Sequence, residues 1–312
     1  MRIAVFGTGG VGGYFGGRLA QAGEEVICIA RGQHLQALRT CGLRVQSVKG
    51  DFVVSPVQAM DDPVQVGIVD VVLVGVKAWQ VPEAAQAMRP LTGPETSVVP
   101  LQNGLEAPAQ LADALGAQHV LGGTCVISSF VAAPGCVRHT GLEPSVSFGE
   151  LDNRPSARAE RLRQAFERAE VAAIIPPDIR VAIWEKFMAI RFGPVGAVAR
   201  APVGVLRRLP ETRQLIEQAA DETLAVARAY GIALAEEAPR HMMAALESAP
   251  PSLIASLQRD ILEGRPSELD GLNAALVRLG QSVGVATPLH AFIYGSLLPL
   301  ELRARGQVQF PG

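Results

Sequence analysis

The sequence feature that most constrains the fold is a glycine-rich segment near the N-terminus. It matches the pattern GxGxxG and consists of Gly7, Thr8, Gly9, Gly10, Val11 and Gly12. The segment follows an apolar run typical of a buried strand, Ile3–Phe6, and opens a stretch of helical composition, Val11–Ala22. In this context the first glycine permits a tight turn, the second lets the backbone approach a pyrophosphate, and the third lets helix and strand pack closely. We therefore expect a dinucleotide-binding loop with the anion at the helix N-terminus; the alternative is a glycine-rich turn without a ligand.

Short β-branched runs alternate with helical stretches through the first half of the chain. The expected strands are Ile3–Phe6, Val26–Ile29, Val69–Val76 and Ser97–Leu101. The expected helices between them are Val11–Ala22, Gln33–Leu38, Pro82–Met88 and Leu105–Leu115. Such alternation predicts a parallel, doubly wound sheet of the Rossmann type. Two β-rich pieces interrupt it: Leu43–Val57 resembles a hairpin turning at residues 49–51, and Val120–Gly149 resembles an antiparallel extension.

The second half of the chain is helical in character. After Pro176 and Pro177 the expected helices are Ile179–Phe192, Glu211–Tyr230, Ala238–Leu246, Ser252–Leu262, Glu268–Val283 and Leu289–Arg305. Prolines and glycines between these stretches mark the turns. We therefore predict an α/β chain with a Rossmann-type, dinucleotide-binding domain at residues 1–178 and an all-helical substrate and catalytic domain at residues 179–312.

The composition argues against several classes of protein. The chain has 312 residues, of which 48% are hydrophobic and 19% are charged, and its formal net charge is −2. These values argue against a disordered chain and a nucleic-acid-binding surface, and 5% aromatic residues argue against a base-stacking platform. No apolar run reaches the ~18 residues that a transmembrane helix needs, and the first residues lack the pattern of a signal peptide. We expect a cytoplasmic protein without membrane association; the oligomeric state stays open, with a homodimer among the options.

The four cysteines give no sign of a metal or redox site. Cys28, Cys41, Cys125 and Cys136 form no CxxC pair, and none lies at metal-ligand spacing from a histidine. We expect no metal and interpret these cysteines as small hydrophobic residues of a protein from a reducing compartment.

The residue after the second expected strand indicates the cofactor. An NAD site places an acidic residue there to bind the ribose diol, whereas this chain has Arg31 after Ile29 and Ala30. A guanidinium at this point pairs with a 2′-phosphate, so we expect NADP(H). The alternative is a solvated surface arginine.

Two polar residues follow further strands of the predicted sheet. Lys77 ends the apolar run that begins at Val69, and Asn103 follows the strand Ser97–Leu101. Since the carboxyl ends of strands border the ligand crevice in such sheets, Lys77 is a candidate to hold a phosphate or a substrate carboxylate. Asn103 is a candidate to bond nicotinamide, ribose or substrate. The alternatives are a lysine that caps a strand and a plain Asn-Gly turn.

Lys186 is the sharpest catalytic candidate. Its helix, Ile179–Phe192, is apolar nearly all round, which is typical of a buried helix. A lysine buried there is costly unless it faces a cleft or a partner, and Ala182 and Ala189 on the same face leave room around its amine. Desolvation would lower the pKa of the amine toward neutrality and suit it to proton transfer. The alternative is a side chain that reaches the surface beside Glu185.

Glu268 has an ordinary interpretation when it is taken by itself. Ser267 and Asp270 resemble a helix-capping arrangement, and the carboxylate of Glu268 suits the positive end of a helix dipole. Ser256, within its predicted helix, has no distinguishing feature of its own.

Several motifs, in order along the chain, carry a family resemblance. They are GTGGVGG, VKAWQ, LQNG, WEKF, SLQRD, GRPSELDGLN and TPLH. Together they resemble the ketopantoate reductases (2-dehydropantoate 2-reductases) over essentially the whole chain. The resemblance implies a Rossmann domain that binds NADPH and a helical domain that closes over a 2-oxo acid.

The resemblance also implies roles for individual residues. Lys186 would be the proton donor, and Glu268 would be the acid near the nicotinamide and the substrate. Ser256 would hold the substrate, and Asn103 and Lys77 would line the crevice. Glu268 and Ser256 gain their importance from the resemblance, because spacing alone does not single them out.

The chain departs from the family pattern after Lys186. The family commonly has one asparagine four residues after the catalytic lysine and another about four residues further on. Here Ile190 stands at the first place, and Gly193 or Pro194 stands at the second, depending on a one-residue gap. Two amides expected to bind polar groups of the substrate are therefore replaced, and a contribution of Arg191 to the site stays open.

We therefore expect NADPH-dependent reduction of a 2-oxo acid, with 2-dehydropantoate, which becomes pantoate in pantothenate biosynthesis, as the first choice. One alternative is a reductase of a different small, more apolar 2-oxo acid. Another is an NADP(H)-binding regulator without turnover.

Overall fold

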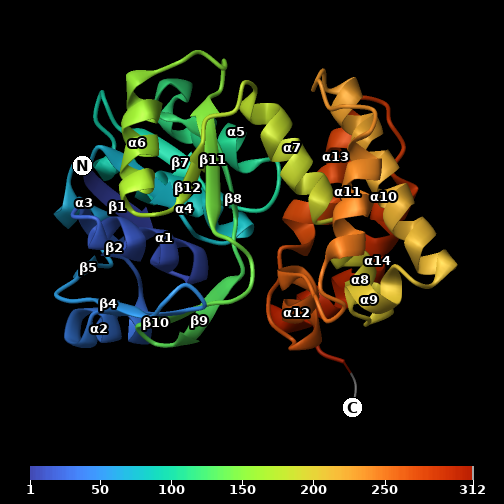
Figure 1. Cartoon of the computed structure of the whole chain (residues 1–312), viewed down its shortest axis with the longest axis horizontal. Helices are drawn as coiled ribbons and strands as arrows, with labels where there is room; N and C mark the ends of the chain where they lie inside the picture. Colours follow the sequence, from blue (N-terminus) through green and yellow to red (C-terminus); the bar gives the residue numbers. More distant parts are fainter. Residues whose placement is uncertain (311–312) are drawn as a thin grey trace. The chain divides into compact units, whose positions relative to one another are not determined.

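The computed structural model describes residues 1–310, which form two compact units (Figure 1). The first comprises Met1–Gln102 and Glu106–Ala182, and the second comprises Asn103–Leu105 and the chain from Ile183 onward. The first unit contains a parallel sheet with helices and the second is built from helices, which confirms the predicted fold class. The predicted domain boundary at residue 178 stays a prediction, since helix α7 (Ile179–Ala189) runs through the point at which the units divide.

A five-stranded parallel sheet with the order β5-β2-β1-β6-β7 forms the centre of the first unit. Its strands are β1 (Arg2–Phe6), β2 (Glu25–Ile29), β5 (Gln58–Met60), β6 (Val71–Val74) and β7 (Ser97–Pro100). The four predicted strands are confirmed, although β6 is shorter than the predicted run Val69–Val76. Because the strands are parallel, the residues that follow β1, β2 and β6 leave the sheet at the same edge.

Alternate residues of β1 enter two hydrophobic cores. Ile3 and Val5 belong to one core, and Ala4 and Phe6 belong to the other. The helices that line the first core are α1 (Gly10–Gln21), α2 (Gly32–Cys41) and α6 (Ala157–Arg168). Those that line the second are α3 (Pro63–Val66), α4 (Val81–Ala87) and α5 (Ala107–Leu115). Successive side chains of a strand point to opposite faces, so this apolar strand requires helices on both sides of the sheet.

Short 3₁₀ turns extend the connections of this unit. They are η1 (Ala78–Gln80), η2 (Arg89–Leu91) and η3 (Ala117–His119). The first of them lies directly after Lys77 of the VKAWQ motif and precedes α4 without a gap. Lys77 is the N-cap residue of this turn.

Two smaller sheets complete the first unit, with the orders β4-β3-β10-β9 and β12-β11-β8. Their strands are β3 (Leu43–Ser47), β4 (Phe52–Val54), β8 (Leu121–Val126), β9 (Ser129–Ala133), β10 (Cys136–His139), β11 (Ser145–Glu150) and β12 (Ala172–Ile174). The predicted hairpin is confirmed as the antiparallel pair β3–β4. The predicted antiparallel extension is confirmed only in part. Its pairs β8–β11 and β9–β10 lie in different sheets, and β10 also pairs with β3 in parallel. Such long-range pairing depends on tertiary packing, which local composition does not reveal.

The second unit consists of helices joined by short turns. They are the end of α7, α8 (Phe192–Ala199), α9 (Val203–Leu206), α10 (Pro210–Ala229), α11 (Ala238–Ser248), α12 (Ser256–Leu262), the π-helical segment η4 (Asp270–Ala274), α13 (Ala275–Ser282) and α14 (Pro288–Ala304). A π-helical segment inside a helix frequently accompanies a functional site.

Two predicted helices have different bounds in the structure. The helix predicted at Ile179–Phe192 ends at Ala189, because the N–H groups of Arg191 and Gly193 bond to carbonyls three residues back and Pro194 has no N–H. The helix predicted from Ser252 begins only at Ser256. Two carbonyls before it bond to the start of α9 instead. The carbonyl of residue 253 accepts the N–H of residue 203, and the carbonyl of residue 251 accepts the N–H of residue 204.

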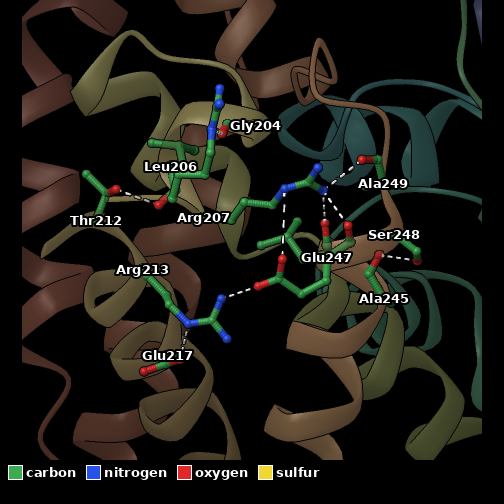
Figure 2. Close-up of polar contacts among 12 residues, drawn as sticks. Gly204, Leu206, Arg207, Thr212, Arg213, Glu217, Ala245, Glu247, Ser248 and Ala249 are labelled. Atoms are coloured by element: carbon green, nitrogen blue, oxygen red, sulfur yellow. Dashed lines mark hydrogen bonds and ion pairs between the residues drawn. The ribbon is translucent and has the colours of Figure 1, made fainter. Parts of the chain in front are cut away.

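Arg207 fixes the end of α11 (Figure 2). One nitrogen of its guanidinium donates to the carbonyls of Leu246, Glu247 and Ala249 over 2.7–2.8 Å. These carbonyls lie at the C-terminus of α11, where the last carbonyls of a helix need partners from outside the helix. Arg213 on α10 pairs with the side chain of Glu247, so the same turn is held from two directions.

Within residues 1–310 no helix is both long and apolar enough to cross a membrane. In the same residues no group of three or more His, Cys, Asp or Glu side chains is arranged to hold a metal ion. The cysteines at positions 28, 41, 125 and 136 form no disulfide.

Candidate active site

The glycine loop connects β1 to α1. Gly7 has a φ of +95°, which favours glycine, and a Cβ there would lie 2.7 Å from the backbone nitrogen of Val76. A Cβ at Gly12 would lie 2.3 Å from the carbonyl oxygen of Gly7, so loop and helix leave no room for a side chain. At Gly9, the N-cap of α1, nothing lies within 4 Å of such a Cβ. The loop is closed at its base and open at Gly9, where an anion can approach the helix N-terminus.

The other loop residues shape this cradle. The buried Thr8 hydroxyl donates to the carbonyl of Ile29 at 3.2 Å, which ties the loop to β2. A Cβ at Gly10 would lie 2.7 Å from the carbonyl oxygen of Ser129, so β9 passes close to the start of α1. Val11 is half-buried. These residues set the path of the backbone, and the backbone N–H groups are what the loop offers to an anion.

Arg31 lies beyond β2 and is the N-cap residue of α2. Its side chain is 71% exposed, and its guanidinium lies 3.6 Å from the carboxylate of Glu83 on α4, which is 75% exposed. An ion pair between two exposed side chains contributes little free energy. A phosphate can therefore replace the carboxylate at Arg31 without a large cost.

Lys77 caps the 3₁₀ turn η1 beyond β6. Its backbone N–H donates to the side-chain oxygen of Gln80 at 3.1 Å. Its ammonium nitrogen lies 5.9 Å from the centroid of the Trp79 ring, within the range of a cation–π contact. Nearby, the side-chain amide of Gln102 donates to the carbonyls of Val74 and Val76 at 2.8 and 3.0 Å. These bonds restrain the backbone that follows β6, which includes the half-buried Lys77.

Asn103 and Glu268 are in direct contact in the second unit. The side-chain amide of Asn103 donates to the carboxylate of Glu268 at 3.1 Å. Glu268 is 6% exposed and directly precedes the helical segment that continues into η4. The backbones also approach closely, since a Cβ at Gly104 would lie 3.0 Å from the carbonyl oxygen of Gly271. The structure thus brings together two predicted site residues that are 165 positions apart.

Lys186 lies on α7, which is less buried than the sequence predicts. Ile183 and Phe187 are buried, but Glu185 and Ala189 are exposed and Lys186 itself is half-buried. The expectation that this helix is buried all round is therefore wrong. The apolar content of a segment does not show which side its neighbours leave uncovered. A half-buried amine can reach both solvent and a bound molecule.

Ser256 is an exposed residue at the start of α12, with Ala255 as the N-cap. It lies in the first turn of a seven-residue helix, whereas the sequence predicts a position further inside a longer one. Lys186 on α7, Ser256 on α12 and Glu268 before η4 thus lie in three different segments of the second unit. Glu268 is hydrogen-bonded to a further predicted site residue, Asn103.

Arg191, whose role the sequence leaves open, is 1% exposed. Its side chain donates to the carbonyl of Phe187 at 2.8 Å and to that of Leu272 at 3.1 Å, and its guanidinium carbon lies 3.7 Å from the centroid of the Phe187 ring. Burial lowers the pKa of Arg191 to about 9. Ile190 before it is half-buried. Arg191 therefore bonds to the helical unit itself and links α7 to η4.

The predicted capping arrangement before η4 is only half correct. The Ser267 hydroxyl accepts the N–H of Leu269 at 3.3 Å, as in a cap. The carboxylate of Asp270 instead pairs with Arg278 at 3.1 Å. The backbone N–H of Ser267 goes to Glu301, a residue that the sequence motifs do not single out. No local pattern could have revealed it, because 34 residues separate the two.

Comparison with known proteins gives matches along most of the chain. The family model described as "Ketopantoate reductase PanE/ApbA" matches residues 3–153, and its C-terminal companion matches residues 178–301. A 2-dehydropantoate 2-reductase of Halobacterium salinarum is 31% identical, over 93% of this chain and 95% of that protein. An uncharacterized oxidoreductase of Bacillus subtilis is 29% identical, over 95% of this chain and 98% of that protein.

A solved structure shares the fold over nearly the whole length. It is a PanE/ApbA family ketopantoate reductase from Ralstonia eutropha, with a TM-score of 0.88 and 32% identity. The alignment covers 98% of this chain and all of that chain. Both the sheet-containing unit and the helical unit thus have counterparts in one protein.

Proposed function

Because the chain belongs to the ketopantoate reductase family, we propose that it reduces 2-dehydropantoate to pantoate with NADPH, a step of pantothenate biosynthesis. The family makes the chain an oxidoreductase, and relatives named for 2-dehydropantoate support a 2-oxo acid as the substrate. The observation that carries the proposal is the hydrogen bond between Asn103 and Glu268. It joins two predicted site residues of the helical unit, and one of them is a buried acid.

The cradle at the glycine loop fits the cofactor. Gly7 and Gly12 leave no room for side chains, while Gly9 leaves the backbone open, so a pyrophosphate can approach the N-terminus of α1. The exposed guanidinium of Arg31 suits the 2′-phosphate that distinguishes NADPH from NADH. When bound, NADPH supplies a hydride to C2 of the 2-oxo acid.

The residues of the second unit act on the substrate in this proposal. Lys186 donates a proton to the carbonyl oxygen as negative charge develops there. Ser256 and Asn103 bond polar groups of the acid, and Glu268, held by Asn103, accepts hydrogen bonds from a hydroxyl group of the ribose or the substrate. In the first unit Lys77 offers a positive charge to a phosphate or to the substrate carboxylate.

A second substrate class has one observation in its favour. Ile190 stands at one place where the family commonly has an asparagine, and Gly193 or Pro194 stands at the other; none of these residues presents a side-chain amide to a substrate hydroxyl. An apolar group binds better than a hydroxyl at such a surface, because a buried hydroxyl without a partner is costly. The alternative substrate is therefore a small 2-oxo acid without the 4-hydroxyl group.

One experiment tests both substrates. NADPH oxidation is followed with the purified protein and a panel of 2-oxo acids that includes ketopantoate and its analogue without the 4-hydroxyl group, 2-oxo-3,3-dimethylbutanoate. We expect the highest kcat/KM for ketopantoate. A higher kcat/KM for the analogue would move the assignment to the more apolar class. If the protein binds NADPH but none of these acids leads to its oxidation, the result would contradict the proposed function and favour a regulator.

A further inference from the structure

Glu301 on α14 is a buried acid with several hydrogen bonds. It is 4% exposed. Its two carboxylate oxygens accept the backbone N–H of Ser267 at 3.1 and 3.0 Å, and one of them accepts the Ser267 hydroxyl at 2.5 Å. The guanidinium of Arg305, one turn further along α14, donates to Glu301 at 2.7 Å. The charge of the acid is therefore paired, and its oxygens are directed at one residue of the chain.

Ser267 is held on every polar group it has. Its N–H and its hydroxyl donate to Glu301, and its carbonyl accepts the guanidinium of Arg305 at 3.3 Å. The residue is fully buried, so no solvent can replace these partners. Bonds to both the N–H and the carbonyl restrain the peptide groups on either side of Ser267. The second of these peptide groups is the one that leads into Glu268.

The other end of Glu268 is restrained as well. Its carboxylate accepts the side-chain amide of Asn103 at 3.1 Å. The backbone of Glu268 thus starts from a residue clamped by α14, while its carboxylate meets Asn103. We propose that Glu301 is a positioning residue that acts through Ser267 to hold the carboxylate of Glu268 in its working place. This inference rests on the role proposed for Glu268 above.

A local residue does not take over this task. Asp270, which lies at capping distance from Ser267 in the sequence, pairs with Arg278 instead. In Glu301→Gln the side chain keeps one acceptor oxygen, but an NH₂ group replaces the other. That NH₂ group then faces a donor of Ser267 or Arg305 and cannot accept its hydrogen bond. Displacement of a group in an active site by about 1 Å can cost about 10²-fold in rate. We therefore expect Glu301→Gln to lower kcat by about tenfold or more.

The chain offers a matched control in an acid whose contacts lie at the opposite end of α14. Glu222 on α10 is also buried, at 8% exposure, and it also accepts backbone N–H groups, those of Leu289 at 2.9 Å and His290 at 3.2 Å. Its contacts hold the first turn of α14, whereas those of Glu301 hold Ser267. Glu222→Gln makes the same chemical change at a similar burial, so it shows what loss of stability alone does to kcat.

The test compares kcat, KM and Tm for Glu301→Gln and Glu222→Gln with NADPH and ketopantoate. We expect a fall in Tm for both variants but a fall in kcat of about tenfold or more only for Glu301→Gln. The comparison is repeated in a Glu268→Ala background, where Glu301→Gln should change kcat by less than about twofold. Equal losses of kcat in the two glutamine variants, or an undiminished effect of Glu301→Gln in the Glu268→Ala background, would overturn the inference.

Two further measurements keep the test decisive. If Glu301→Gln does not fold, Ser267→Ala removes the hydroxyl that bonds Glu301 and accepts the N–H of Leu269, and it leaves the backbone bond to Glu301 in place. An unchanged kcat in that variant contradicts the inference. Amide hydrogen exchange at residues 267–269 needs no turnover; it should rise in Glu301→Gln and stay as in the wild type in Glu222→Gln. A wild type that reduces no 2-oxo acid would refute the proposed function, whereas a working wild type with an unaffected Glu301→Gln variant would refute only this inference.

Discussion

The side-chain amide of Asn103 donates a hydrogen bond to the carboxylate of Glu268 at 3.1 Å, and both residues belong to the helical unit although 165 positions separate them. Asn103 follows β7 along the chain, whereas Glu268 directly precedes the helical segment with the π-helical turn. The contact gives the buried acid a donor, as a buried carboxylate requires. The short segment Asn103–Leu105 belongs to the helical unit.

The exposed Arg31 leads to a prediction about cofactor choice. Arg31→Ala should reduce the preference for NADPH over NADH by about tenfold or more, because a charge-assisted hydrogen bond is worth roughly 1.5–3 kcal/mol. Affinities for both cofactors are measured by fluorescence titration. Arg44→Ala, which removes an exposed arginine from β3, should leave the preference unchanged. Equal affinities of the wild type for the two cofactors would rule out this role.

Lys186 leads to a prediction about the proton donor. Lys186→Ala should lower the single-turnover rate of hydride transfer by ~10²–10⁴-fold, the usual contribution of general acid catalysis. NADPH affinity should hardly change, since the glycine loop is untouched. Lys186→Arg should not restore the rate, because a guanidinium keeps its proton at neutral pH. Lys49→Ala, at an exposed lysine that pairs with Glu143, is the control. A near-normal rate in Lys186→Ala would remove the lysine from the mechanism.

Ile190 leads to a prediction about specificity. Ile190→Asn restores an amide at the place where the family commonly has one. The variant should raise kcat/KM for ketopantoate relative to the analogue without the 4-hydroxyl group, by about tenfold if one neutral hydrogen bond forms. Ile190→Leu, which restores no amide, serves as the control. An unchanged ratio in Ile190→Asn would show that this position does not determine specificity.

The buried Arg191 leads to a prediction about stability. Its guanidinium is bonded to two carbonyls and lies over the Phe187 ring, and burial lowers the pKa of Arg191 to about 9. Replacing a buried ion pair with apolar side chains of similar volume is often stabilising by about 1–4 kcal/mol, because desolvation of the charges costs more than their attraction gains, and a desolvation cost of the same kind applies to the buried guanidinium. Arg191→Met should therefore raise the free energy of unfolding in urea by an amount at the lower end of that range. Arg240→Met, at an exposed arginine, should change it little. A large loss of stability in Arg191→Met would mean that the carbonyl bonds outweigh desolvation.

The pair Glu222 and His290 predicts how stability depends on pH. Burial lowers the pKa of His290 from 6.5, although its bond to Glu222 opposes this. Burial would raise the pKa of Glu222, but the bonds from His290 and from two backbone N–H groups outweigh it and lower the pKa below 4.5. As pH falls below about 6.5 the unfolded imidazole binds a proton that the folded one does not, and below about 4.5 the same holds for the carboxyl group. Both groups therefore make the folded state less stable toward acid.

The measurement is the Tm of the wild type between pH 8 and pH 5. We expect a decrease, with each kcal/mol lost worth about 2–4 °C. His290→Gln keeps a donor for Glu222 and does not titrate, so the decrease should be smaller in that variant. An equal decrease in both proteins would assign the pH dependence to other groups.

Several features could be predicted because they depend on neighbouring residues. The apolar run at Ile3–Phe6, the turn at Gly7 and the close packing at Gly12 are local, so the glycine loop and the parallel sheet follow from the sequence. The motifs that resemble ketopantoate reductases add Lys186, Glu268 and Ser256 as candidates. The incomplete burial of α7 and the late start of α12 were not predictable in the same way. Both depend on which other segments cover a helix or bond to its preceding residues.

The sequence by itself determined the alternation of strands and helices in the central sheet, the glycine loop and the kinds of side chain present, since hydrophobic period and turn residues act over a few positions. Only the tertiary structure decided which distant groups meet. It placed Asn103 on Glu268, Glu301 on Ser267 and Arg191 on the carbonyl of Leu272. A buried polar group requires a partner, but the partner can come from any part of the chain, so packing alone selects it.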